Sequence, residues 1–356
     1  MILSQLNLTD FKNYRASSFS FDAGINCVVG KNGLGKTNLL DAVHYLAFAK
    51  TAFPTTDAQN VCHGQAAFTL YAVFLDDLTV ACQFQHRKGK SLKVNQQEEK
   101  KISNHVGRIP LVMTTPDDSD IIREGSEFRR KFFDEAICQI DRSYLEDLMA
   151  YNAVLRQRNE HLKQAEQPNQ VNHTLLDTYD GQLLPYAERI GKRRAEFLKE
   201  YVTAFEANYH ALFPGEETPG IAYESDATRP DFQTHFRQAR PRDVLMQRTL
   251  VGIHKDQYEF VLNDQAIKKF GSQGQQKTFI IALRLAEYDI LKTHTGTAPL
   301  LLLDDIFDKL DDDRIRALVH LLDDEVRFHQ VFITDARKER SRTFFKKRNV
   351  NFIELS

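Results

Sequence analysis

Gly30-Lys31-Asn32-Gly33-Leu34-Gly35-Lys36-Thr37 is the stretch that decides the fold. It fits the pattern G-x-x-x-x-G-K-[ST] at every fixed position. The residues before it, Ile25 to Val29, are typical of a short buried strand, and Thr37 to Ala49 carries apolar residues at helical spacing. A strand, a glycine-rich turn and a helix in this order predict a loop whose backbone N–H groups bind phosphate oxygens.

The residue types in this loop have distinct expected roles. Lys36 is expected to reach the β- and γ-phosphates of a nucleotide, and Thr37 to ligate Mg²⁺. The start of the helix adds its partial positive charge. A chance glycine-rich turn is the alternative, and the flanking strand and helix argue against it. The predicted nucleotide-binding residues are Gly30, Lys31, Asn32, Gly33, Leu34, Gly35, Lys36, Thr37 and Asn38, with Lys36 also catalytic.

A second motif supplies carboxylates. Leu300 to Leu303 is an apolar run that ends in Asp304 and Asp305, as in a buried strand that brings acids to the sheet edge where α/β proteins bind ligands. We assign Asp304 to the Mg²⁺ shell and Asp305 to a catalytic role, polarising the attacking water. A strand that ends in a polar turn is the alternative, and the phosphate-binding loop makes it the weaker one.

A third element precedes a helix predicted from Gln275 to about Lys292. Ser272 resembles an N-cap, and a helix start with a hydroxyl and bare N–H groups can bind an anion. Helix caps of this kind are common, so the position of the element shortly before the acidic strand adds most of the weight. Ser272, Gln273 and Gly274 therefore join the predicted nucleotide-binding set.

The order of the predicted elements outlines the domains. Alternating β segments fill Phe68 to Val94, helical periodicity runs from about Glu127 to Phe213, and β signals return at Gly220. Because β-rich sequence flanks the helices on both sides, we interpret them as an insertion in an α/β head. The predicted parts are 1–120, the N-terminal part of the head; 121–215, a helical lobe; and 216–356, the C-terminal part of the head.

Taken together, the motifs resemble the heads of ABC-type ATPases, and more specifically the RecF family of SMC-like ATPases. This resemblance implies an α/β fold, namely a P-loop NTPase head of the ABC type with an inserted α-helical lobe. It also implies ATP and Mg²⁺ as cofactors and a weak, DNA-stimulated ATPase that acts as a switch. The segments that carry it are Leu8 to Tyr14, Thr37 to Ala42, Phe128 to Asp134, Tyr151 to Asn159, Ser272 to Gln276 and Leu302 to Asp311.

The resemblance further implies an ATP-dependent homodimer. ATP held by Lys36 and Thr37 of one chain would meet Ser272 of the other, and Phe307 to Asp311 resembles the D-loop of that interface. The implied function is binding of double-stranded DNA near single-stranded gaps and assistance of RecA loading together with RecR and RecO.

Net charge is −2 at pH 7, so DNA contact requires local basic clusters. We favour Arg129 and Arg130 together with Lys192, Arg193 and Arg194, because they recur on the helical lobe. A solvated face is the alternative for each cluster. For Arg130, an i,i+4 salt bridge to Asp134 is the competing interpretation.

Some positions depart from the family pattern. His254-Lys255-Asp256 stands where the family more usually has a proline and an arginine. Thr334-Asp335 stands where transporter-type relatives have a switch histidine, and Asp305 replaces the glutamate of many ABC heads. No Q-loop glutamine can be placed.

Three other interpretations stay open: another SMC-like repair or defence ATPase head, a P-loop kinase, and a scaffold that binds nucleotide without hydrolysis. The four cysteines lack metal-binding spacing. No apolar run reaches the roughly 20 residues that a membrane helix needs, and no signal peptide is evident. A cytoplasmic location without membrane association is expected.

Overall fold

The computed structural model describes residues 1–164, 171–346 and 349–356, and the chain divides into two compact units. The first contains Met1–Ser119, Ala207–Glu216 and Ser272–Ser356, and the second contains Asp120–Glu206 and Glu217–Gly271. This differs from the predicted boundaries, which place residues 217–271 in the head. They belong with the helical lobe because two strands of this segment pair with each other and one of them packs against a lobe helix.

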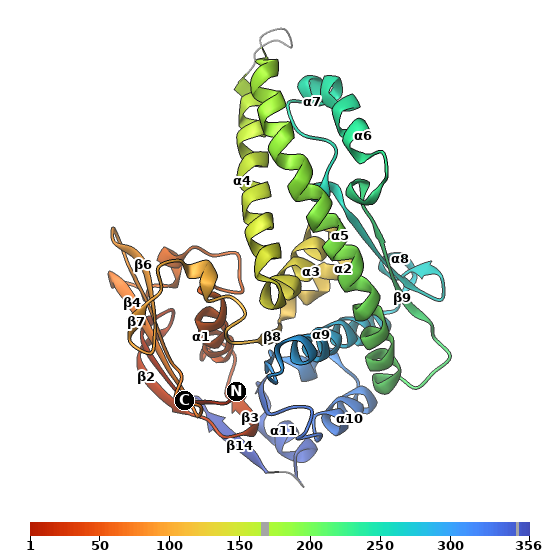
Figure 1. Cartoon of the computed structure of the whole chain (residues 1–356). Coiled ribbons are helices and arrows are strands. Elements are labelled where there is room, and N and C mark those ends of the chain that lie inside the picture. The colour runs from red at the N-terminus through yellow and green to blue at the C-terminus, as the bar shows by residue number, and fades with distance from the viewer. Residues whose placement is uncertain (165–170, 347–348) are drawn as a thin grey trace. The chain divides into compact units, whose positions relative to one another are not determined.

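The first unit contains a five-stranded parallel sheet in the order β14-β3-β13-β12-β8; Figure 1 labels β14, β3 and β8 of this sheet. The three inner strands, β3, β13 and β12, and the edge strand β8 are buried almost throughout. Their apolar runs predict this burial, because parallel sheets are covered on both faces. β3 lies between β13 and β14, both from the C-terminal part of the sequence. The bounds are β3 (Gly24–Val29), β8 (Leu111–Thr114), β12 (Leu300–Leu303), β13 (Gln330–Asp335) and β14 (Val350–Glu354).

A second, antiparallel sheet has six strands in the order β2-β1-β4-β5-β6-β7. Helix α1 (Lys36–Phe48) contacts strands of both sheets, and one apolar core that includes Leu6, Leu40 and Leu302 joins them. The strands are β1 (Leu3–Phe11), β2 (Tyr14–Ser20), β4 (Ala67–Phe74), β5 (Thr79–Gln85), β6 (Gly89–Val94) and β7 (Gln97–Glu98).

The remaining α-helices of the first unit are α9, directly before β12 in the sequence, and α10 and α11 after it. Helix α9 (Gln273–Thr295) packs against β8. The others are α10 (Asp312–Leu321), α11 (Lys338–Phe344) and the short 3₁₀ segments η1 (Asp57–Asn60), η2 (Ile102–Asn104), η3 (Pro116–Asp118) and η7 (Ile306–Lys309).

The second unit contains an antiparallel helix pair and a three-stranded sheet, β11-β10-β9. Three ion pairs show that the two helices are antiparallel, because the residue number in one helix rises while that of its partner in the other helix falls. The pairs are Asp141–Arg193, Asp147–Arg189 and Arg158–Asp180. The elements are α2 (Ser119–Arg123), α3 (Ser126–Ile140), α4 (Arg142–Gln164), α5 (His173–Leu212), β9 (Pro219–Glu224), η5 (Asp226–Thr228), α6 (Phe232–Gln238), α7 (Arg240–Met246), η6 (Ile253–Lys255), β10 (Gln257–Leu262), β11 (Gln265–Ala266) and α8 (Ile267–Phe270).

In the part of the chain that the structure describes, no helix combines the length and the apolar character that crossing a bilayer requires.

Candidate functional site

The predicted phosphate-binding loop connects the end of β3 to the start of α1. Gly33 and Gly35 have positive φ angles of 85° and 103°, a conformation that favours glycine. A Cβ on Gly35 would also lie 2.5 Å from Nδ2 of Asn13. Position 35 therefore requires glycine both for its backbone conformation and for its close approach to the turn between β1 and β2.

Lys36 is the first residue of α1, and its side chain is folded over the loop. Its Nζ donates to the carbonyl oxygens of Gly30 at 2.6 Å and Lys31 at 3.1 Å. No described side chain caps the start of α1, so this helix end keeps N–H groups that can bind an anion. The loop, the ammonium group and the helix end thus present positive charge to one site.

The turn between β1 and β2 supports the loop through hydrogen bonds that the sequence motif does not predict. Asn13 donates from Nδ2 to the carbonyl oxygen of Leu34 at 3.1 Å and accepts from Nδ2 of Asn38 at 2.7 Å. The Tyr14 hydroxyl donates to the carbonyl oxygen of Gly35 at 3.0 Å. Burial raises the pKa of Tyr14 to about 12, so the hydroxyl remains a donor at neutral pH.

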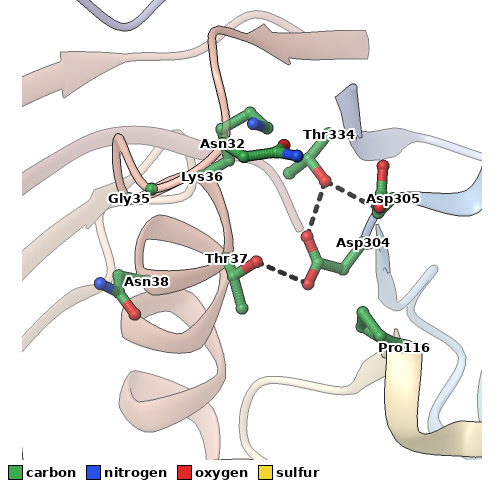
Figure 2. A pocket seen from close by; sticks show the side chains of 10 residues that line it. Asn32, Gly35, Lys36, Thr37, Asn38, Pro116, Asp304, Asp305 and Thr334 are labelled. Carbon is green, nitrogen blue, oxygen red and sulfur yellow. Dashed lines mark hydrogen bonds between the residues drawn. The ribbon is translucent and has the colours of Figure 1, made fainter. Parts of the chain in front are cut away.

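The carboxylates at the end of β12 face the loop (Figure 2). Asp304 is buried and accepts from Oγ1 of Thr37 at 2.8 Å and from Oγ1 of Thr334 at 2.6 Å. The same Thr334 oxygen accepts from the backbone N–H of Asp305 at 2.8 Å. One threonine at the end of β13 therefore holds both acids in place.

Loop and acids share one pocket of ≈ 320 Å³. Three residues of the predicted loop, Gly30, Lys31 and Leu34, do not line it. Two unpredicted residues do: Thr334, and Pro116 in the segment after β8. The lining residues are Asn32, Gly33, Gly35, Lys36, Thr37, Asn38, Pro116, Asp304, Asp305 and Thr334.

The predicted Mg²⁺ ligands are brought together in this pocket. The Thr37 hydroxyl and a carboxylate oxygen of Asp304 lie 2.8 Å apart, and both residues line the pocket. A hydroxyl and a carboxylate are hard oxygen donors of the kind that Mg²⁺ prefers, together with substrate phosphates and water. The donor set therefore fits this ion, which when bound supplies neutralisation of phosphate charge.

Ser272 forms the N-cap of α9, as the sequence predicts. Its Oγ accepts from the backbone N–H of Gln275 at 3.2 Å, and its own N–H donates to Oε1 of Gln275 at 2.7 Å, which completes a capping box. A Cβ on Gly274 would lie 2.9 Å from Nη1 of Arg314, so the helix start packs closely on α10. Ser272 and Gln273 are exposed, and residues 272–274 do not line the pocket.

Comparisons with known proteins agree with this geometry. The family model described as RecF/RecN/SMC N terminal domain matches residues 2–353. The DNA replication and repair protein RecF of Cytophaga hutchinsonii is 43% identical over 355 residues, which cover 99% of this chain and 94% of that protein. The protein of the same name from Flavobacterium johnsoniae is 41% identical and covers 97% of both chains. The chain belongs to the RecF family.

Solved structures of RecF and of a more distant relative share the fold. A structure of the recombination mediator protein RecF-ATP in the RecFOR pathway matches with a TM-score of 0.86 at 27% identity, over 95% of this chain and 92% of that one. The SmcHead bound to the C-winged helix domain of ScpA matches with a TM-score of 0.55 at 14% identity, which concerns the fold alone. The predicted fold class, an α/β ABC-type ATPase head with a helical insertion, is confirmed.

In this RecF family member, the segment resembling a D-loop is anchored to the C-terminal end of β13. Phe307 is buried against two phenylalanines at the end of α11. Arg340 donates to the carbonyl oxygen of Phe307 at 3.3 Å and to Asp335 at 2.8 Å. Asp335 is the neighbour of Thr334, so consecutive residues of β13 hold the acids and the segment that follows them.

The basic residues predicted to contact DNA are mostly engaged within the second unit. Arg194 is 1% exposed and pairs with Asp134 at 2.8 Å and Asp256 at 2.6 Å. This contradicts the prediction for Arg194, because a guanidinium enclosed by two carboxylates cannot face a phosphate. Arg193 is half-buried and pairs with Asp141 at 2.9 Å.

Arg129 and Arg130 point into the same unit. Arg129 donates to the carbonyl oxygens of Ile121 and Glu124 at 3.2 and 3.1 Å, and Arg130 donates to that of Asp256 at 2.8 Å. The carboxylate that competes for Arg130 in the sequence, Asp134, instead accepts from Arg194. Of the five predicted residues, Lys192 alone extends into solvent, with 78% of its side chain exposed.

Proposed function

We propose that the chain is an ATP-driven switch of DNA repair that binds ATP in this pocket, dimerises around it and hydrolyses it slowly. One observation carries the proposal. The pocket contains the phosphate-binding loop and both acids, whereas the capped and exposed Ser272 lies outside it. A two-fold dimer would bring Ser272 of each copy to the ATP held by the other.

The chain's own groups account for the chemistry. The loop N–H groups and Lys36 bind phosphate oxygens, and Asp305 orients the attacking water while Thr334 fixes its backbone. Only a triphosphate reaches from the loop of one copy to the helix start of the other. Hydrolysis therefore removes the contact that favours the dimer.

We further propose that the dimer acts in the bacterial cytoplasm on double-stranded DNA near single-stranded gaps, assists RecA loading with RecO and RecR, and has its ATPase stimulated by DNA. The relatives support this role, since they are named DNA replication and repair proteins. A solved RecF structure is assigned to the RecFOR pathway.

Light-scattering mass with ATP and Mg²⁺ tests the composite site. Wild type should dimerise, whereas Lys36→Met and Ser272→Arg should stay monomeric. Thr174→Arg places the same charge on another exposed first turn, that of α5, and should dimerise normally. The proposal is contradicted if the molecular mass of wild type does not change with ATP, or if Ser272→Arg dimerises normally. Phosphoryl transfer to a small molecule by a monomer would support the kinase alternative.

A further inference from the structure

A group of exposed cations lies on the antiparallel sheet of the first unit. Arg87 and Lys88 occupy the turn between β5 and β6, Lys93 lies on β6, and Lys100 and Lys101 follow β7. The side chains of all five are exposed, and no described residue forms an ion pair with any of them.

The strand register brings four of these cations to one end of the sheet. Strand β7 is antiparallel to β6, and the N–H of Glu99 donates to the carbonyl oxygen of Leu92 at 2.9 Å. The chain after β7 therefore runs back along β6 toward the β5–β6 turn. Lys100 and Lys101 consequently approach the turn that carries Arg87 and Lys88. Three neighbouring strands about 4.8 Å apart span roughly 10 Å.

The carboxylates near this end of the sheet do not neutralise its charge, because they pair with other cations or lie away from the turn. Glu99 pairs with Arg108 at 2.8 Å, and Asp57 pairs with Lys90 at 2.9 Å. Glu98 is exposed and lies opposite Lys93, at a distance from the turn along the strand. The turn between β4 and β5, at the other end of these strands, carries two aspartates. The sheet thus has a basic end and an acidic end.

We propose that this basic end, formed by Arg87, Lys88, Lys100 and Lys101, is the surface that contacts the phosphates of double-stranded DNA. The inference rests on the proposed function, because it assumes that the chain acts on DNA. A duplex carries one charge per about 1.7 Å of its axis, so a surface roughly 10 Å wide can meet several phosphates. Contacts of this kind orient the protein on DNA without reading its sequence.

A second group of exposed arginines provides the comparison. Arg237, Arg242 and Arg248 lie in or beside α6 and α7 of the second unit. Leu245 and Met246, whose exposed fractions are 73% and 50%, lie between Arg242 and Arg248 in the sequence. Apolar side chains gain nothing from contact with phosphate, and none of the large exposed apolar side chains among the described residues lies in the β5–β6 turn or directly after β7. We therefore assign the phosphate contact to the basic end and use the arginines of α6 and α7 as a control.

Fluorescence anisotropy with a labelled duplex, measured in ATP and Mg²⁺ over a range of salt concentrations, tests the assignment on the full chain. The triple variant Arg87→Gln, Lys88→Gln, Lys100→Gln should bind at least about tenfold more weakly. The slope of log K against log salt should fall by about 0.9 for each lost contact. The control Arg237→Gln, Arg242→Gln, Arg248→Gln removes the same charge and should keep the wild-type slope.

Several outcomes overturn the assignment. An unchanged affinity and slope of the basic-end variant would do so, as would an equal loss in the control. Binding of a fluorescent ATP analogue and the melting temperature should match wild type, because all six positions lie outside the pocket. If the triple variant misfolds, Lys88→Gln and Lys101→Gln are measured singly, and unchanged slopes in both refute the assignment. Failure of wild type to bind any duplex refutes the proposed function instead.

Discussion

Thr334 and Asp304 face each other across the ends of two neighbouring parallel strands, with the threonine hydroxyl donating to the carboxylate at 2.6 Å. The hydroxyl oxygen also accepts the N–H of Asp305 at 2.8 Å. Asp305 has a positive φ of 49°, a strained conformation for a residue other than glycine. The hydrogen bond to Thr334 therefore stabilises the backbone at the residue assigned to orient water.

Replacing Thr334 by valine should slow ATP turnover by about ten- to a hundredfold, with a smaller change in ATP affinity. The reason is that one buried and one partly buried hydrogen bond disappear, each worth roughly 1–3 kcal/mol when its partner stays unsatisfied. Thr334→Ser keeps the hydroxyl and should retain most activity. Steady-state kinetics that separate kcat from KM check this, and equal loss in the serine variant would contradict it.

Gly35→Ala should abolish ATP binding. A Cβ at this position meets the Asn13 amide at 2.5 Å, on a backbone with φ of 103°, so the loop has to shift. Gly181→Ala, in an exposed position of α5 with no atom within 4 Å of the added carbon, should instead stabilise the fold by about 0.5–1 kcal/mol. Titration with a fluorescent ATP analogue and thermal unfolding distinguish the two effects.

Arg194→Met should destabilise the second unit by about 3–5 kcal/mol, because Asp134 and Asp256 would lose the cation that compensates their burial. The exposed pair of Arg189 with Asp147 at 2.7 Å offers a matched control. Arg189→Met should cost less than about 1 kcal/mol. Urea unfolding followed by circular dichroism measures both, and similar losses would show that Arg194 is not the buried anchor described here.

Stability should fall as the pH drops below 6.5, partly because of His254. Burial lowers the pKa of this ring to about 4 from 6.5. Its Nε2 lies 3.0 Å from the carbonyl oxygen of Thr249 and its Nδ1 lies 2.8 Å from the Tyr151 hydroxyl, so the folded state keeps the neutral ring. This contribution to stability is complete above pH 6.5 and is lost as the pH falls toward 4. The loss in the free energy of unfolding reaches about 2 kcal/mol at pH 5.

A His254→Gln variant checks this assignment. It should lose less stability than wild type between pH 8 and pH 5, by about the same 2 kcal/mol. His105 is also buried with a lowered pKa and contributes in the same direction in both proteins. An identical pH dependence of urea unfolding in the variant would remove His254 from the explanation.

Local sequence patterns predicted the parts of the site that are continuous in the chain. The strand, loop and helix around Lys36 and the apolar run ending in Asp304 are each recognised in one continuous stretch, Ile25 to Ala49 and Leu300 to Asp305. The role of Thr334 was not predicted, because it depends on the pairing of β13 with β12. In the sequence, this position was noted only for its lack of a histidine. Asn13 belongs to a segment that carries the family resemblance, but its contact with the phosphate-binding loop can be recognised only from the folded structure.

Long-range pairing also explains the errors. The β signal at Gly220 suggested a return to the head, but β9 pairs with β10 in the second unit. Arg194 looked like one member of a basic run on a helix surface. Its burial depends on Asp256, a residue 62 positions away, which helical spacing cannot reveal.

The position of β3 between β13 and β14 has a consequence for how the protein is made. The strand that leads into the phosphate-binding loop is synthesised first, but both of its neighbours come from residues 330–354. At about 5–20 residues per second, a ribosome needs roughly 15–60 s to supply them. During that time the loop lacks its supporting sheet, so a prematurely terminated chain should contain the complete ATP-binding motif and still be unable to bind ATP.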